Sequence, residues 1–179
     1  MKKAIKIGLK FFVTAILLIL VASCGSATVS AESGIKIKAG QSINLDDVSM
    51  GLENGWSSSE GGHTWSNGYL SILKFNYDNE FENGMNLSVR MGSFVNNKNP
   101  NMKVSIKAND VVVKELDFNE SLSGGDISID ISSEVLKKNS SQLILSFDMP
   151  NAAVPSEIGW NRDGRRLGIW ISKIQVNKI

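Results

Sequence analysis

The chain has 179 residues, of which 42% are hydrophobic and 21% are charged, and it contains one cysteine and one histidine. A lone cysteine excludes an internal disulfide, and a lone histidine with no cysteine near it is poor material for a zinc site. Outside the four lysines of the first ten residues, 15 basic (19 − 4) and 18 acidic residues remain and form no basic block, so the charge pattern excludes a nucleic-acid-binding protein.

The first 23 residues have the composition of a secretory signal peptide. Residues 1–10 carry lysines and no acid, residues 11–22 are apolar apart from one threonine, and small residues follow. An apolar run of about a dozen residues is too short for an ordinary membrane span, which needs about 20. The pattern therefore predicts export from the cytoplasm and removal of the leader.

The four residues that end at Cys24 (VASC) resemble a bacterial lipobox. In lipobox precursors the cysteine thiol is acylated with diacylglycerol and the chain is cut just before it. The resemblance implies a lipid-anchored protein of the cell envelope that begins at Cys24, and Gly25 after it favours the outer membrane where there is one. Cleavage after Ala31 is the open alternative because residues 29–31 are also small, and it would leave a soluble secreted or periplasmic protein.

The chain after the leader is long enough for one domain, and residues 24–34 form a small, polar tether before it. Farther along, apolar and polar residues alternate with period two, which is typical of half-buried strands. The strands expected from this pattern are 69–75, 85–91, 103–108, 126–131, 142–147 and 168–176. Residues 109–110 have the composition of a two-residue hairpin turn, and 132–139 is the one stretch that favours a helix.

About nine or ten short strands with turn residues between them, and almost no helix, predict an all-β fold. We expect a single antiparallel β-sandwich or jelly roll over residues 35–179, similar to a carbohydrate-binding module. A fold of this kind does not by itself establish a function.

Two stretches do not fit the alternation and are expected to be loops. Residues 55–68 (GWSSSEGGHTWSNG) hold four glycines and two tryptophans, and residues 154–168 (VPSEIGWNRDGRRLG) hold a third tryptophan among charged residues. In this order the two stretches resemble a β-sandwich domain of unknown function that is appended, outside the cytoplasm, to bacterial membrane glycosyltransferases and phosphoglycerol transferases. The positions that carry the resemblance are Gly55, Trp56, Ser57, Glu60, Trp65, Ser66 and Gly68, and then Pro155, Asp163, Arg165, Leu167 and Gly168.

The resemblance extends over about residues 50–176. This chain departs from the family at Ser59, where the family often has proline, and at residues 61–63, where the family often has a bulky residue. No glycosyltransferase is attached here. The resemblance therefore implies a place in glycan assembly at the cell envelope, and it does not imply an enzyme.

The aromatic residues of the two stretches have alternative roles. As exposed rings, Trp56 and Trp65 would form a platform on which a sugar stacks; as buried rings, they would close the end of the sandwich. Trp160 lies outside the family pattern and is a candidate aromatic contact for a ligand, whereas Trp170 alternates within a strand and is expected in the core. His63 follows two glycines, is expected to be exposed, and is another candidate ligand contact.

Three charged residues, Glu60, Asp163 and Arg165, are expected to form a partly buried cluster that orders both loops, because a guanidinium suits bidentate pairing with carboxylates. Alternatively, the same groups would hydrogen-bond sugar hydroxyls. A glycosidase pair of Glu60 with Asp163 would need a defined separation that the sequence cannot supply, and the chain has no nucleophile-elbow motif. We predict no catalytic residue, no metal ligand and no cofactor.

The sequence leaves two functions open. The first is a non-catalytic envelope lipoprotein that binds a glycan or supports polysaccharide assembly. The second is a protein–protein interaction module that docks on an envelope complex or enzyme, through the same loops or through an uncapped strand edge. In both, the membrane is reached through the lipid on Cys24.

Overall fold

The computed structural model describes residues 34–47 and 54–179. The leader, Cys24 and Ala31 lie outside the described residues, so lipidation and the cleavage site stay predictions. Among the residues that are described, no helix is long and apolar enough to cross a membrane.

Strands and the turns between them account for most of the described chain, and the predicted all-β class is confirmed. The strands are β1 Ile35–Ile37, β2 Ser42–Asn44, β3 Trp56–Glu60, β4 His63–Ser66, β5 Leu70–Tyr77, β6 Gly84–Ser93, β7 Asn101–Ala108, β8 Val111–Asn119, β9 Gly124–Ser132, β10 Gln142–Asp148 and β11 Ile169–Lys178. Two short helices, η1 (Leu45–Asp47) and α1 (Ser133–Lys137), complete the elements.

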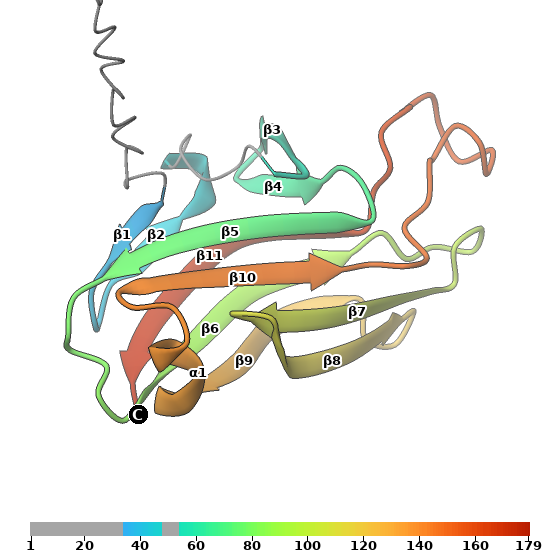
Figure 1. Cartoon of the computed structure of the whole chain (residues 1–179). Helices are drawn as coiled ribbons and strands as arrows, with labels where there is room; N and C mark the ends of the chain where they lie inside the picture. The colour runs from blue at the N-terminus through green and yellow to red at the C-terminus, as the bar shows by residue number, and fades with distance from the viewer. Residues whose placement is uncertain (1–33, 48–53) are drawn as a thin grey trace, which may run out of the picture.

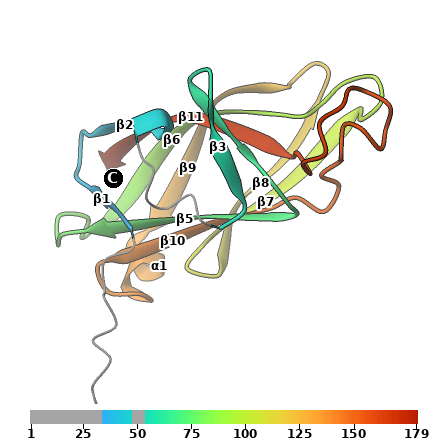
Figure 2. The same ribbon diagram turned by 90° about the horizontal axis from the view of Figure 1, so that it is seen from above.

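The strands form two sheets that pack face to face as a β-sandwich. One sheet has the order β1-β5-β10-β7-β8, and the other has the order β3-β4-β11-β6-β9 with β2 also paired to β11. The pairs are antiparallel except β1 with β5, which is parallel. In Figure 1 β5 and β10 lie in front of β11 and β6, and the view from above in Figure 2 separates these two layers.

The core lies between the sheets and is filled by the apolar side of each alternating strand. Its largest fully buried rings, Phe75, Phe118 and Phe147, come from β5, β8 and β10 of the five-stranded sheet. Leu87 and Ile171 approach them from β6 and β11 of the other sheet. Burial of one such side chain contributes about 1.5–3 kcal/mol, so the period-two alternation of the sequence largely decides which face of each strand points inward.

The predicted hairpin turn at residues 109–110 is confirmed. Asn109 and Asp110 both have positive φ, 46° and 66°, as a two-residue turn of this type requires. The Asn109 side chain is buried, donates from Nδ2 to the Val135 carbonyl (3.0 Å) and accepts from the Ile144 amide (2.9 Å). The turn is thereby tied to α1, whose N-cap Ser132 accepts from Val135 N–H (3.4 Å) near the predicted start of the helix.

The expectation of a long loop over residues 55–68 is wrong. Residues 56–60 and 63–66 are the strands β3 and β4, which pair with each other in an antiparallel hairpin. Gly61 and Gly62 form its turn with φ of 60° and 91°, values that glycine adopts without steric cost. The glycines that made the stretch look like a loop are the residues that let the chain reverse between two strands.

Candidate functional site

The β3–β4 hairpin places its two tryptophans on opposite sides of the six-stranded sheet. Trp56 points inward and only 8% of it is exposed. Its indole Nε1–H donates to the Ile72 carbonyl (3.0 Å), and its ring meets Phe147 edge-on at 5.7 Å between centroids. Of the two roles predicted for Trp56, the sugar platform is wrong, because the ring closes the core beneath the hairpin.

Trp65 points outward, where its ring contacts His63 and meets Phe94 edge-on at 6.3 Å between centroids. Its partner in register on β11 is Trp170, and His63 lies between the two indoles, with ring centroids 5.8 Å from Trp65 and 5.4 Å from Trp170. All three rings are half-buried, so part of each stays in contact with solvent. We call His63, Trp65 and Trp170 the aromatic cluster.

Two sequence expectations about the aromatic cluster are wrong. Trp170 is not in the core, because Ile169 and Ile171 on either side of it take the inward positions of β11. His63 is not fully exposed, because it packs between the two indoles. Neighbouring residues in a strand point to opposite faces. This alternation puts Trp170 on the outer face, and it puts His63 on the same face as Trp65.

The indole of Trp170 lies against the main chain of the neighbouring strand. Gly92 is its partner in register on β6, and a Cβ at Gly92 would lie 2.6 Å from the Nε1, Cε2 and Cζ2 atoms of the indole. Gly124 on β9 is opposite Gly92, and a Cβ there would lie 2.8 Å from the Cα of Gly92. The lack of a side chain at Gly92 therefore lets the aromatic cluster lie low on the sheet.

Polar side chains continue this face along β6, β9 and β11. Arg90 donates from Nε and Nη2 to the two carboxylate oxygens of Asp126, each at 2.9 Å. Their side chains are 58% and 55% exposed, so the middle of the face is open to solvent. The hydrogen bond from Arg90 lowers the pKa of the Asp126 carboxyl, and this keeps the pair ionised at neutral pH.

Farther along the same face, Asn86 is the centre of a second set of hydrogen bonds. Its Nδ2 donates to Ser128 Oγ (2.7 Å) and to Asp130 Oδ1 (2.6 Å). Its Oδ1 accepts from Asn177 Nδ2 (3.3 Å). These bonds hold amide and hydroxyl groups in fixed positions at the surface.

The three charged residues that the sequence expected together do meet. Arg165 bridges Glu60, at the end of β3, and Asp163, in the loop before β11. Its Nη2 lies 2.6 Å from Asp163 Oδ2 and 3.3 Å from Glu60 Oε2. We call Glu60, Asp163 and Arg165 the charged clamp, because it joins a hairpin to a loop more than 100 residues later in the chain.

The electrostatics of the charged clamp do not suit acid–base chemistry. Hydrogen bonds from Arg165 lower the pKa of Asp163, and the bonds to Asp163 and Glu60 raise the pKa of the Arg165 guanidinium. A glycosidase acid needs a carboxyl whose pKa is raised. The lowered pKa of Asp163 favours its carboxylate form, and the clamp joins the end of β3 to the loop before β11.

Trp160 lies in the loop 149–168, apart from the aromatic cluster. It is 48% exposed, its amide donates to the Pro155 carbonyl (2.8 Å), and no ring contact of its indole is found in the described part of the chain. Nearby in sequence, Arg166 stacks on Tyr69 with its guanidinium carbon 4.6 Å from the ring centre. The structure therefore brings His63 and Trp65 together with Trp170, and it brings Glu60, Asp163 and Arg165 together, but it leaves Trp160 separate.

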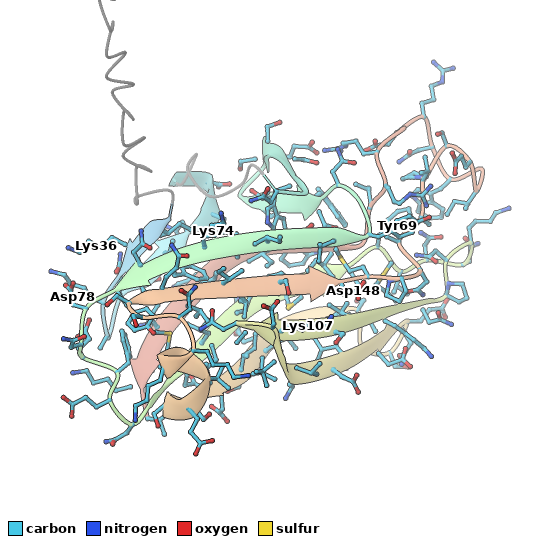
Figure 3. The ribbon with its side chains drawn as sticks, viewed as in Figure 1. Lys36, Tyr69, Lys74, Asp78, Lys107 and Asp148 are labelled. Carbon is cyan, nitrogen blue, oxygen red and sulfur yellow. The ribbon has the colours of Figure 1, made fainter. Side chains whose placement is uncertain are left out.

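The outer face of the five-stranded sheet has a different character. Figure 3 labels Lys74 on β5, Lys107 on β7 and Asp148 on β10, with Tyr69 just before β5. Lys107 and Asp148 project beside Ser146 and Ser105 in register, and this face has no cluster of rings among the described residues. Among the residues that the structure describes, the outer face of the six-stranded sheet combines rings with hydrogen-bonded polar side chains.

Trp170, Gly92 and the polar residues beyond them were not predicted from the sequence as parts of a site. A signal for them was present: the polar phase of the alternation in 86–92, 124–130 and 170–177 falls on one face once the strands pair. The register between strands was needed to see it, and a single sequence does not supply that register.

Comparison with known proteins shows the fold. No family model and no curated protein sequence matches the chain. Among solved structures, the insecticidal delta-endotoxin Cry8Ea1 from Bacillus thuringiensis is similar with a TM-score of 0.50 and 13% identity over 84% of this chain, which spans only 26% of that protein. The carbohydrate-binding module CsCBM6-3 from Clostridium stercorarium, in complex with cellobiose, has a TM-score of 0.43 and 12% identity over 82% of this chain and 98% of the module. At these identities the likeness concerns the β-sandwich alone.

Proposed function

We propose that this protein is a non-catalytic module of the cell envelope that binds a glycan on the outer face of the six-stranded sheet. The observation that carries the proposal is the aromatic cluster of His63, Trp65 and Trp170, set low on the sheet beside exposed polar groups. Sugar rings have an apolar face and a rim of hydroxyls. Partly exposed indoles and nearby fixed hydrogen-bonding groups suit both parts.

A non-catalytic role is favoured by the state of the carboxylates near the aromatic cluster. Glu60 and Asp163 both accept hydrogen bonds from Arg165, and the pKa of Asp163 is lowered. A lowered pKa opposes proton donation to a leaving group at neutral pH. The clamp instead positions β3 beside the cluster, because Glu60 is the partner of His63 in register.

The envelope context of the proposal comes from the leader. Acylation of Cys24 would tether the sandwich to a membrane through residues 25–34, and the resemblance to domains appended to glycan-assembling enzymes favours a role in envelope polysaccharide assembly. Intact mass of the protein from membranes tests the tether. We expect a chain that begins at Cys24 with a lipid-sized increment that Cys24→Ala removes; an unmodified chain that begins at Glu32 would contradict it.

The binding experiment uses the mature protein and follows tryptophan fluorescence and heat of binding. The probes are soluble envelope glucans, peptidoglycan fragments and O-antigen oligosaccharides. Trp65→Ala and Trp170→Phe remove or reduce the stacking surface, and Trp160→Ala is the matched control because it removes an exposed indole elsewhere. Thermal unfolding of each variant shows that it folds.

We expect one class of glycan to bind and its affinity to fall at least about tenfold, or about 1.4 kcal/mol, in Trp65→Ala but not in Trp160→Ala. Loss in Trp160→Ala alone would move the site to the loop 149–168 and overturn the assignment to this face. If no glycan binds at millimolar concentration, glycan binding is wrong. Crosslinking of a stoichiometric envelope protein would then support the docking module.

A further inference from the structure

We propose that the same face binds an extended, uncharged glycan chain that runs along β11 over several sugar units. This inference rests on the proposed function and adds the shape and charge of the ligand. It starts from the register of five strands, in which β4 and β2 both pair with β11, β11 pairs with β6, and β6 pairs with β9. Residues that are partners in register on neighbouring strands form a row across the face. Successive rows run from the aromatic cluster to the far end of β11.

The first row is aromatic and the next three are polar. Trp65, Trp170, Gly92 and Gly124 form the first row. Asn44, Lys173, Arg90 and Asp126 form the second row. Ser42, Gln175, Ser88 and Ser128 form the third, and Asn177, Asn86 and Asp130 form the fourth. Amides and hydroxyls, which both donate and accept, thus predominate beyond the first two rows.

The length of these rows suits a chain of sugars better than one terminal sugar. From Trp170 to Asn177 the face corresponds to six residue steps of the paired strand β6, from Gly92 to Asn86, because the register shifts by one residue between Ile171 and Lys173. Six steps at about 3.3 Å per residue are about 20 Å. Arg90 and Asp126 remain more than half exposed in the middle of this distance, so the face is not interrupted there. A single sugar on the aromatic cluster would leave the last two rows unused.

The charge of the face favours an uncharged ligand. Within the four rows, the two cations Arg90 and Lys173 are balanced by the two carboxylates Asp126 and Asp130. Arg90 is paired to Asp126, and Lys173 acts on the same carboxyl by lowering its pKa. An anionic chain would meet Asp130 and Asp126 without an excess of cations to offset them, and a cationic chain would meet Arg90 and Lys173.

The far end of the face is ordered before any ligand arrives. Asn86 holds Ser128 and Asp130, and Asn177 holds Asn86, at distances between 2.6 and 3.3 Å. Side chains that are already fixed lose little conformational entropy when a ligand binds. Free lone pairs and amide protons of this network are then available to hydroxyls along the chain.

The experiment compares ligand lengths and two matched double variants. The probes are β-linked gluco-oligosaccharides from the disaccharide to the hexasaccharide, and oligogalacturonides of the same lengths as the anionic series. The variant Asn86→Ala/Asn177→Ala removes the amide pair at the far end of the face. The control Asn76→Ala/Gln142→Ala removes an amide pair of similar geometry (3.2 Å) from the other sheet.

We expect affinity to rise with length, and the uncharged hexasaccharide to bind about tenfold more tightly than the disaccharide and than the hexagalacturonide. The far-end variant should lose this gain while disaccharide binding and the control stay unchanged. Equal affinity at all lengths, with binding still lost in Trp65→Ala, would overturn the extended site and leave glycan binding intact. Tighter binding of the anionic series would overturn the assignment of charge. If neither series nor the envelope glycans bind, the proposed function itself fails.

Discussion

Trp56 and Trp65 belong to one hairpin and to one short sequence motif, but they lie in different environments. Trp56 is buried with its N–H bonded to Ile72, and its ring packs on Phe147 in the core. Trp65 lies on the outside of the sheet against His63 and Trp170. The comparison teaches that the tryptophan content of a motif does not reveal a binding site. The face of the strand decides whether a ring stabilises the protein or remains available to a ligand.

The largest expected effect is on the inner side of the hairpin. Trp56→Ala would leave a cavity against Phe147 and remove the hydrogen bond to the Ile72 carbonyl, and we expect a loss of about 3–5 kcal/mol of unfolding free energy in urea denaturation. Trp65→Ala is the comparison and should cost clearly less, because its ring is half-exposed. Equal losses of unfolding free energy in the two variants would contradict the assignment of Trp56 to the core and of Trp65 to the open surface.

The second effect is at the contact between the aromatic cluster and β6. Gly92→Ala places a Cβ 2.6 Å from the Trp170 indole, so the ring must move. We expect about 1–3 kcal/mol of destabilisation, as for other overpacked sites, with a shift of tryptophan fluorescence and weaker glycan binding. Gly164→Ala is the control, since a Cβ there meets no atom within 4 Å. Unchanged fluorescence in Gly92→Ala would contradict the position of the indole.

A smaller effect is expected at the charged clamp. Arg165→Gln removes the partner of Glu60 and Asp163, which are partly exposed, and should cost about 1 kcal/mol at neutral pH. Arg162→Gln, in the same loop, is the control and should change little.

The charged clamp also predicts a pH dependence with a definite sign. The folded pKa of Asp163 is lowered, so its stabilisation is fully present above the unfolded value of about 3.9 and is lost as pH falls through the folded pKa. The difference in melting temperature between the wild type and Arg165→Gln should therefore be constant from neutral pH to about 5 and shrink below about 4. A difference that grows in acid would contradict the pairing.

The smallest effect on stability is expected on the open polar face. Arg90→Gln breaks the pair with Asp126, whose side chains are both more than half exposed, so melting temperature should hardly move. Affinity for the glycan should fall, because the second polar row loses its ordered charge pair. Isothermal titration calorimetry of the variant measures the affinity. A large loss of stability without a loss of affinity would show that the Arg90–Asp126 pair stabilises the fold and does not contact the ligand.

Much of the fold could be predicted because it depends on local patterns. The alternation of 85–91 and 126–131 predicted strands that lie inside β6 and β9, and the two residues Asn109 and Asp110 predicted a turn. The β3–β4 hairpin was missed because its serines and glycines have low strand propensity. Pairing with β11 and the burial of Trp56 outweigh that propensity in the folded protein.

The site could be predicted only in part. Glu60, Asp163 and Arg165 were expected together on chemical grounds, because opposite charges in two loops can order each other, and they do meet. Trp170 was assigned to the core because it alternates within the expected strand 168–176. In a largely apolar strand, either set of alternate residues could face the core. Only packing against the other sheet shows which set points inward.

The sequence by itself determined the class of fold, the hairpin turn at residues 109–110 and the chemistry of the charged clamp. These depend on periodicity, on backbone preferences and on the attraction of unlike charges. The sequence also carries the prediction of export and of a lipid on Cys24. The tertiary structure alone decided that Trp56 is inside, that His63 and Trp65 meet Trp170 outside, and that rows of amides and hydroxyls continue from them. The physical reason is strand register, which aligns residues far apart in the chain and is set by the joint burial of many side chains at once.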